Sequence, residues 1–421
     1  MKKILHGFSF IALFSVFAIS FAHAEFDGDL LSRPHRIFEI GVDSDVAYAN
    51  SSFALNDLLT KKLVVDFKKI SDSVPKNGFT FSLCEEEKVF VNLNLSSHFR
   101  FSLFNSVETN ATVNISKDLF DFLGDGLDIG GSETTDLKGC AESFYNIGAS
   151  FQTIVRDFGV KFTPTYYVPL FYIPKTTATG SIETTSRGLI KAHAEADVDI
   201  YTAIDMHDFM ENGKHASDLE ISAGKLLSNG GFDFAFEIER NWLHGLNAGA
   251  YTRIPLVPGI LKHKMSTRYW ADFYTENLLD SYIGDSEKPD PKHGHDDFVY
   301  TEDNFKVYRP LKLGLNATYM PFGDWFKIQP ALGFAIRDPY SSDATFYPEY
   351  ALDLRFAFVK QIFNFDLGTA YKSQIFQHSF GFALNFRVLE IVTKASWCGT
   401  NFVSSFKRTG YGAMVGVRIG W

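Results

Sequence analysis

The chain has 421 residues, and its 40 lysine and arginine residues against 50 aspartate and glutamate residues give a formal net charge of −10. Hydrophobic residues make up 45% of the sequence, with 43 Phe, 18 Tyr and 5 Trp, yet the mean hydropathy is only −0.06. The acidic balance argues against nucleic acid as a partner. Many aromatic residues with cancelling hydropathy are typical of strands that have one apolar and one polar face.

Residues 1–24 have the features of a cleaved secretory signal peptide. Lys2 and Lys3 precede the apolar run "FSFIALFSVFAISFA" (8–22), and the small-x-small site Ala22-His23-Ala24 follows it. This run is short for a retained membrane helix, which needs about 20 residues. After it, the sequence has no further apolar run of about that length, so we expect a secreted chain that begins at Glu25 and has no transmembrane helix.

The three cysteines are Cys84, Cys140 and Cys398. In an oxidising compartment two of them could form a disulfide, Cys84 with Cys140 being the best candidates, which would leave Cys398 free. Three free thiols are the alternative. Because no Cys-x-x-Cys spacing occurs, we predict no redox centre, no metal site and no cofactor.

The region 25–131 mixes helical and strand-like patterns. "SSFALNDLLTKKLVVDF" (51–67) has apolar residues near helical spacing, and "NISKDLFDFLGDG" (114–126) looks like a capped helix. Two strand-like runs, "KVFVNLNLS" (88–96) and "FRFSLFNS" (99–106), lie between them. A partly helical segment before a strand-rich region predicts a plug inside a lumen, and a periplasmic module is the alternative.

The region 132–421 alternates between apolar and polar residues almost throughout. In "LIKAHAEADVDIYTAI" (189–204) an unbroken apolar face lies opposite a row of ionisable residues, and in the last third similar runs recur at the length of tilted membrane-crossing strands. Since every backbone group in lipid must be paired, such strands must close on themselves. The predicted fold is all-β, a closed transmembrane antiparallel β-barrel, in preference to a soluble β-sandwich.

The run "GYGAMVGVRIGW" (410–421) is expected to be a wall strand. Its odd-numbered residues from Tyr411 to Ile419 are apolar and would face lipid, with Trp421 at the aqueous interface. The pattern resembles the C-terminal signal by which the outer-membrane barrel assembly machinery recognises its clients. The residues that would form this assembly signal are Tyr411, Val417, Ile419 and Trp421.

The order of these segments resembles the FadL-type family of outer-membrane transporters for long-chain fatty acids and other hydrophobic compounds. The resemblance lies in the signal peptide, "FEIGVDSDVAYANSSFALND" (38–57), the strands "VFVNLNLS" and "FRFSLF", the helix "SKDLFDFLGDG" and the strand-rich remainder. It implies about 14 strands, give or take two, an N-terminal hatch, an apolar substrate pocket and lateral exit into the membrane of a diderm bacterium. The expected partners are a hydrophobic small molecule and outer-membrane lipid.

An apolar ligand needs an apolar pocket, since burying each methylene contributes about 0.8 kcal/mol. The candidate ligand-binding residues are the apolar side chains of the expected plug helices: Phe53, Leu55, Leu58, Leu59, Leu63, Phe67, Phe120 and Phe122. The alternative is that these side chains form the core of the plug itself.

"VKFTPTYYVPLFYIP" (160–174) carries Pro164, Pro169 and Pro174 within one strand pattern. A proline lacks the N–H that a ladder needs, so this wall is expected to be kinked or bulged. The three prolines therefore predict a lateral opening, whereas the alternative is an ordinary strand that ends in a Pro-rich loop.

No catalytic motif is present, and we expect no enzyme. The segment "KHGHDD" (292–297) has ligand types for a metal but is expected to be a solvated loop. The predicted function is uptake of long-chain fatty acids or similar hydrophobic molecules through a plugged lumen. The alternatives are a diffusion porin for small polar solutes and a surface-exposed adhesin or structural barrel.

Overall fold

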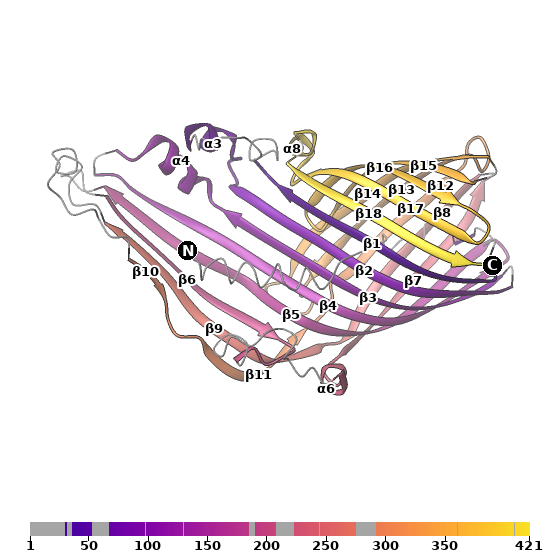
Figure 1. Ribbon diagram of the computed structural model, residues 1–421, viewed down its shortest axis with the longest axis horizontal. Helices are drawn as coiled ribbons and strands as arrows, with labels where there is room; N and C mark the ends of the chain where they lie inside the picture. The colour runs from indigo at the N-terminus through magenta and orange to yellow at the C-terminus, as the bar shows by residue number, and fades with distance from the viewer. Residues whose placement is uncertain are drawn as a thin grey trace.

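The computed structural model describes residues 30–31, 36–52, 67–96, 98–128, 130–184, 190–207, 223–243, 245–274, 292–359, 361–407 and 409–421. Within these ranges, fourteen strands pair into one closed antiparallel ring (Figure 1). In ring order they are β1 (Phe38–Asn50), β2 (Phe79–Ser96), β3 (Phe99–Ile115), β4 (Ser132–Val155), β5 (Phe158–Thr184), β7 (Gly231–Leu243), β8 (Leu246–Val257), β12 (Leu311–Tyr319), β13 (Phe326–Arg337), β14 (Thr345–Phe358), β15 (Phe363–Lys372), β16 (Ile375–Asn385), β17 (Leu389–Gly399) and β18 (Gly410–Gly420). The predicted closed antiparallel β-barrel is confirmed.

The two ends of the barrel differ. At the end where Trp421 lies, the ring strands are joined by short turns, for example Arg156–Asp157 between β4 and β5. We call this the turn end, and the opposite end the loop end. The loop-end connections include four short helices: α3 (Phe67–Ser73), α4 (Lys117–Asp125), α8 (Phe402–Phe406) and, between β6 (Ile190–Thr202) and β7, α6 (Ala223–Leu227).

The region 25–131, in which we expected a plug together with the first strands, contributes three strands to the wall. β1, β2 and β3 all lie within this range, and β1 closes the ring by pairing with β18. The described helices of this range, α3 and α4, lie in loop-end connections and contact each other through the Lys68–Asp125 ion pair. A plug formed by the rest of the region stays a prediction.

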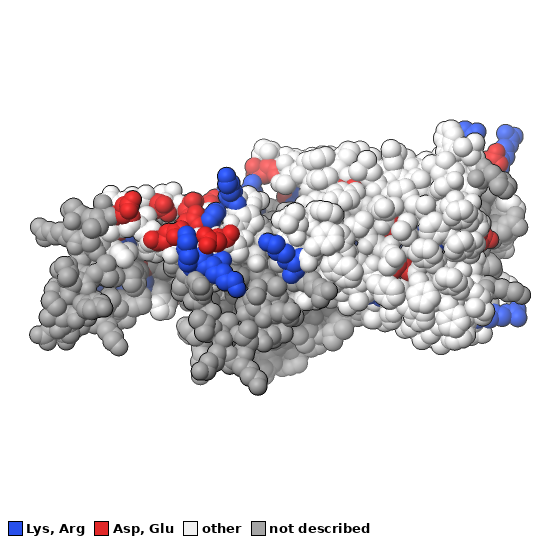
Figure 2. Space-filling model, turned by 90° about the horizontal axis from the view of Figure 1, so that it is seen from above, with Lys and Arg blue, Asp and Glu red and all other residues white. Residues whose placement is uncertain are grey.

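The barrel is apolar outside and charged inside. Large hydrophobic side chains of ring strands are exposed, among them Leu315 at 62% and Leu332 at 63%, whereas Glu142 and Asp233 are almost completely buried. This is the reverse of a soluble protein and suits a wall with lipid outside and a polar lumen inside. Figure 2 shows the corresponding broad belt with few charged residues over the barrel, while charged side chains gather toward the ends.

Four strands form an extension beyond the ring at the loop end: β6, β9 (Gly259–Tyr274), β10 (Lys292–His295) and β11 (Val299–Val307). β6 pairs with the loop-end half of β5 and with β9, and β9 pairs with β10 and β11. Figure 1 shows this sheet projecting past the closed part of the barrel. Residues 190–202 of the segment 189–204 therefore form a strand, as predicted, but this strand lies in the extension beyond the closed ring.

The described residues contain no helix long and apolar enough to cross a membrane. Cys84, Cys140 and Cys398 are all free thiols, so the structure does not contain the Cys84–Cys140 pair that the sequence allowed. Residues 292–295 form β10 rather than the loop expected for "KHGHDD". The predicted signal peptide, 1–24, lies outside the described residues.

The terminal strand allows a test of which face meets lipid. Val415 is 39% exposed on the outer face of β18, and a lipid-facing Arg near the bilayer midplane costs about 2–4 kcal/mol. We predict that Val415→Arg lowers the yield of heat-modifiable, membrane-inserted protein.

The control is Asn92→Arg, which introduces the same side chain on the lumen side of β2, beside the carboxylate of Glu39, and should assemble nearly normally. Gly416 on the lumen face of β18 is not a suitable control, because a Cβ there would collide with Asp43. Normal assembly of Val415→Arg alongside failure of Asn92→Arg would mean that the faces are reversed.

Candidate functional site

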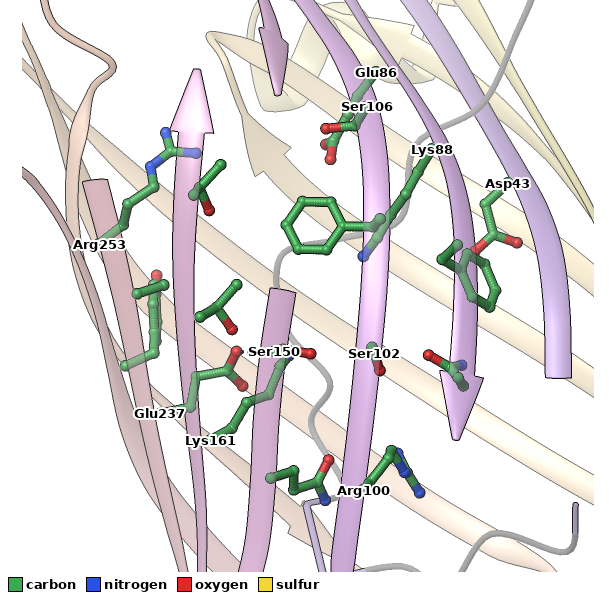
Figure 3. Close-up of a pocket in the computed structure, with 18 of the residues that line it drawn as sticks. Asp43, Glu86, Lys88, Arg100, Ser102, Ser106, Ser150, Lys161, Glu237 and Arg253 are labelled. Atoms are coloured by element: carbon green, nitrogen blue, oxygen red, sulfur yellow. Dashed lines mark hydrogen bonds and ion pairs between the residues drawn. The ribbon is translucent and has the colours of Figure 1, made fainter. Parts of the chain in front are cut away.

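The candidate site is a polar cavity of about 230 Å³ inside the barrel. Residues of β1, β2, β3, β4, β5, β7 and β8, together with Arg309 and Arg418, line it (Figure 3). Six of the lining residues are cationic and four are anionic: Lys88, Arg100, Lys161, Arg253, Arg309 and Arg418 against Glu39, Asp43, Glu86 and Glu237. This lining does not match the apolar pocket that the family resemblance implies.

Ion pairs centred on Arg309 cross the lumen beside this cavity. Arg309 lies in the short link between β11 and β12, and its guanidinium contacts Glu108 on β3 at 2.9 Å and Asp233 on β7 at 2.7 Å. Arg253 on β8 lies 3.6 Å from the same Glu108. Because four ring strands separate β3 from β12, these contacts join opposite sides of the barrel and obstruct its interior.

A second set of contacts crosses nearer the loop end. Arg337 at the end of β13 pairs with Glu142 on β4 at 2.9 Å. The neighbouring Asp338 accepts a hydrogen bond from the hydroxyl of Tyr172 on β5. The interior is therefore bridged at two levels, and a polar solute that followed the barrel axis would have to displace both.

The turn end of the lumen holds part of the N-terminal segment. Leu30 is 1% exposed, and its carbonyl accepts a hydrogen bond of 2.7 Å from Gln152, which faces the cavity from β4. Arg36, on the other side of the same opening, contacts Glu390 and donates to Asn385 at the β16–β17 turn. The described part of this segment thus occupies the lumen next to the polar cavity.

The wall is interrupted beside β5. On this side, the last β5–β7 pair is Tyr167 with Gly231, and the next β5 pair is Phe171 with Thr202 of β6. β6 and β7 therefore pair with successive parts of β5, as two halves of one strand would. The described residues between these two strands form no ladder with β5. On the side of β6 and β7, β5 residues 168–170 have no ladder partner within the described part of the chain. One backbone hydrogen bond remains there, from Ala203 N to the carbonyl of Leu170 at 2.9 Å.

Side chains rather than a ladder seal this interruption. The hydroxyl of Tyr167 donates to the carbonyls of Val257 and Val307, at 2.8 and 3.3 Å. Gly230 and Gly231 leave no room for a Cβ because the rings of Tyr166 and Tyr167 pack directly against them. We call this interruption the seam: β5 residues 166–171 with Thr202, Gly230, Gly231 and the start of β9.

An aromatic cluster lies next to the seam. Phe144, Tyr167, Tyr172, Tyr201, Leu261 and Val307 are all buried and pack together, with Phe305 and Ala203 at the edge. The rings of Tyr201 and Phe305 stack with centroids 3.9 Å apart. This cluster gives the seam an apolar interior, while a second, smaller buried cluster of Ala47, Ala49, Ile375 and Cys398 lies on another part of the wall.

The predicted proline positions coincide with irregularities of β5. Pro169 falls in the seam, where its ring packs on Gly259, and the β4–β5 register shifts beside it. Pro174 falls between Tyr172 and Ala178, where β5 and β6 are unpaired. Pro164 pairs in register with Phe234 of β7 but forms no ladder pair with a described residue of β4. The expected kinks and bulges are present, and the opening itself stays a prediction.

Most of the predicted ligand-binding residues cannot be placed. Phe53, Leu55, Leu58, Leu59 and Leu63 lie outside the described residues, as does the side chain of Phe67, which begins α3. Phe120 and Phe122 are half-buried on α4, where the ring of Phe120 lies 6.0 Å from that of Phe79. These two lie at the loop end and do not line the polar cavity, so their role in binding stays a prediction.

The residues of the predicted assembly signal lie on β18 and directly after it. Val417, Ile419 and Trp421 are exposed at 40%, 48% and 66%, and Tyr411 is half-buried against the ring of Tyr48. The ring of Trp421 packs on Phe38 with centroids 4.8 Å apart. They form one outward face, but recognition by the assembly machinery stays a prediction.

The inner face of the extension carries a row of charged pairs. Tyr172, which points into the barrel mouth, pairs with Tyr201 of β6, so the odd-numbered residues of β6 continue the lumen surface. On this face His193 contacts Asp272 at 2.7 Å and Asp199 contacts Lys264 at 2.9 Å. The hydrogen bond and charge of Asp272 raise the pKa of His193 above its ordinary value.

No family model matches the sequence, and no curated protein does either. Solved structures with a similar overall fold include a deltaS2S3 mutant of the monoaromatic hydrocarbon channel TodX (TM-score 0.44, 12% identity, 96% of each chain covered). They also include the P. putida toluene transporter TodX (0.43, 10% identity, 96% of each chain). A third is a Pseudomonas aeruginosa FadL homologue (0.42, 9% identity, 93% of this chain and 91% of that chain). These likenesses concern the barrel fold of outer-membrane proteins alone.

The ion pairs across the lumen should support the barrel. Removing one partner of a buried ion pair typically costs about 3–5 kcal/mol, because the other charge is left without compensation. We predict that Glu108→Gln, which weakens the contacts of both Arg253 and Arg309, clearly lowers the thermal unfolding temperature in detergent.

Lys138→Gln is the matched control, since it removes one partner of the exposed Lys138–Asp136 pair, and exposed pairs contribute only about 0–1 kcal/mol. Equal unfolding temperatures for Glu108→Gln and Lys138→Gln would show that the crossing pairs do not stabilise the barrel.

A pH titration of His193 can test its contact with Asp272 on the extension. Because the pKa of His193 is raised in the folded state, the stability gained from its contact with Asp272 is fully present below the ordinary histidine pKa of about 6.5 and is lost as the pH rises through the raised value. We predict that Asp272→Asn lowers the pKa of His193 measured by NMR. The exposed, distant Asp343→Asn should leave that pKa unchanged, and a His193 titration that is the same in both variants would contradict the contact.

Proposed function

We propose that this chain is an outer-membrane transporter of a diderm bacterium that takes up hydrophobic small molecules and releases them sideways through the seam. The observation that carries the proposal is the interrupted wall strand between Thr202 and Gly231, sealed by tyrosine and proline side chains instead of a ladder. Because β5 residues 168–170 form no ladder pair on the side of β6 and β7, the wall can part at the seam with few backbone hydrogen bonds broken.

The distribution of polar and apolar surface favours a sideways route. A hydrophobic molecule gains about 0.8 kcal/mol for each methylene that it buries, and the aromatic cluster at the seam offers such a surface inside the barrel mouth. The cavity toward the turn end is lined by ten charged side chains and only a few aromatic ones such as Phe90 and Phe104, and ion pairs of Arg309 and Arg337 cross the interior beside the seam. The molecule would therefore leave through the wall rather than along the axis.

The same aromatic surface supports a finer proposal for the substrate. Long-chain fatty acids or similar molecules are the substrates that we propose, in line with the predicted lateral opening at Pro164, Pro169 and Pro174. The N-terminal segment at Leu30 supports a plugged lumen, since it already occupies the turn end.

We also propose that the outward face of β18, with Tyr411, Val417, Ile419 and Trp421, is what the barrel assembly machinery recognises. A diffusion porin is the second candidate function, favoured by the charged lining of the cavity. The two functions differ in what crosses the lumen, since a porin must let small ions pass along the axis.

A reversible crosslink across the seam tests the transport proposal. Phe171 of β5 and Thr202 of β6 are cross-strand partners at its loop-end edge, and facing positions in antiparallel strands are close enough for a disulfide. In a background with Cys84, Cys140 and Cys398 replaced by Ala, we predict that Phe171→Cys with Thr202→Cys reduces uptake of a labelled long-chain fatty acid severalfold on oxidation, and that reductant restores it.

The control crosslink joins Leu352→Cys on β14 to Thr369→Cys on β15, a partner pair on another part of the wall, and should not change uptake. If the seam crosslink forms completely, as judged by mass spectrometry, and uptake remains at the level of the control, the substrate does not leave by this route.

A further inference from the structure

The lining of the polar cavity has more cationic than anionic side chains, and the excess positive charge lies on two of them. All four carboxylates of the lining have a basic partner: Glu39 with Arg36, Asp43 with Arg418, Glu86 with Lys372 and Glu237 with Lys161. Four of the six cations likewise face a carboxylate, namely Lys161, Arg253, Arg309 and Arg418. The remaining two cations are Lys88 and Arg100.

Neither of these two has a carboxylate within ion-pair distance in the described part of the chain. Lys88 on β2 lies over the ring of Phe104, with Nζ 5.0 Å from the centroid. Arg100 on β3 donates only to the side-chain oxygen of Asn94, at 2.8 Å. Both side chains are half-buried inside the barrel, where an uncompensated charge is costly unless an ion of opposite sign accompanies it.

Hydroxyl groups lie between the two cations. In Figure 3, Ser102 and Ser150 project into the cavity between Lys88 and Arg100. Ser102 faces Ser150 in the β3–β4 register. A hydroxyl can donate to an anionic oxygen, so this wall of the cavity presents cationic and hydroxyl donors. The neighbouring carboxylate Asp43, which lies opposite Lys88 in the β1–β2 register, is already paired with Arg418.

We propose that this wall is an oxyanion-binding site, formed by Lys88, Ser102, Ser150 and Arg100, that takes a phosphate or carboxylate group. Charge-assisted hydrogen bonds from Lys and Arg hold such groups, with Arg suited to two parallel bonds. The site is separate from the seam and does not depend on lateral exit. Its ligand has two possible sources, a free inorganic anion or the acidic head group of an amphipathic molecule.

The test measures binding to the full mature chain in detergent by calorimetry, with inorganic phosphate, octanoate and the uncharged octanol as three separate probes. Binding of phosphate and octanoate indicates a site for the bare oxyanion, while binding of octanoate alone indicates the head group of an amphipathic acid. We expect the affinity for the anion that binds to fall with added salt.

The double variant Lys88→Gln with Arg100→Gln removes both uncompensated charges without breaking an ion pair, so it should still assemble. We expect it to bind the anion at least about tenfold more weakly, as expected for losing hydrogen bonds to charged groups. Lys394→Gln removes the same charge from a different wall strand, where it pairs with Asp353, and should bind as the wild type does.

Three results would overturn the assignment: no binding of either anion, equal affinity for octanol and octanoate, or wild-type affinity in a properly assembled double variant. None of these depends on uptake through the seam. A loss of anion binding with normal fatty-acid uptake would separate this site from the transport route.

Discussion

Backbone pairing is the constraint on which the rest of the structure depends. A strand in lipid has no water for its N–H and C=O groups, so each must find a partner in the wall. β1 and β18 meet that demand by closing the ring, which forces alternate side chains into the lumen. Charged residues such as Glu108 and Asp233 are then buried inside and must be paired there. The same alternation that makes the outside apolar therefore fills the inside with ion pairs.

The seam is where this constraint is relaxed. β5 continues well past the closed ring, and its two halves pair with different strands, β7 toward the turn end and β6 toward the loop end. Prolines cannot donate to a ladder, and Pro169 falls where β5 changes partner. Tyrosine hydroxyls take over part of the missing backbone bonding. A wall held by side chains can part at less cost than one held by a ladder, and ion pairs of Arg309 and Arg337 bridge the interior beside it.

The sequence predicted the structure correctly wherever the structure depends on a local periodicity of the side chains alone. Two-residue alternation predicted the closed barrel and the exposed face of β18, and the prolines marked the irregular strand. Alternation could not say which strands pair, so it missed that β6 and β7 share one wall position. It also missed Arg309, because the residue lies in a link and its partners Glu108 and Asp233 are far away in sequence. Lys88 and Arg100 stand out only once every other charge in the cavity has been matched.

The central claim is that the barrel axis is obstructed and the wall provides the exit. Single-channel recording of the full mature chain in planar bilayers tests it most directly. The account predicts no large, steady conductance, because the pairs of Arg309 with Glu108 and of Arg337 with Glu142 bridge the interior. Large, stable, ohmic channels would contradict it and would identify the protein as a diffusion porin.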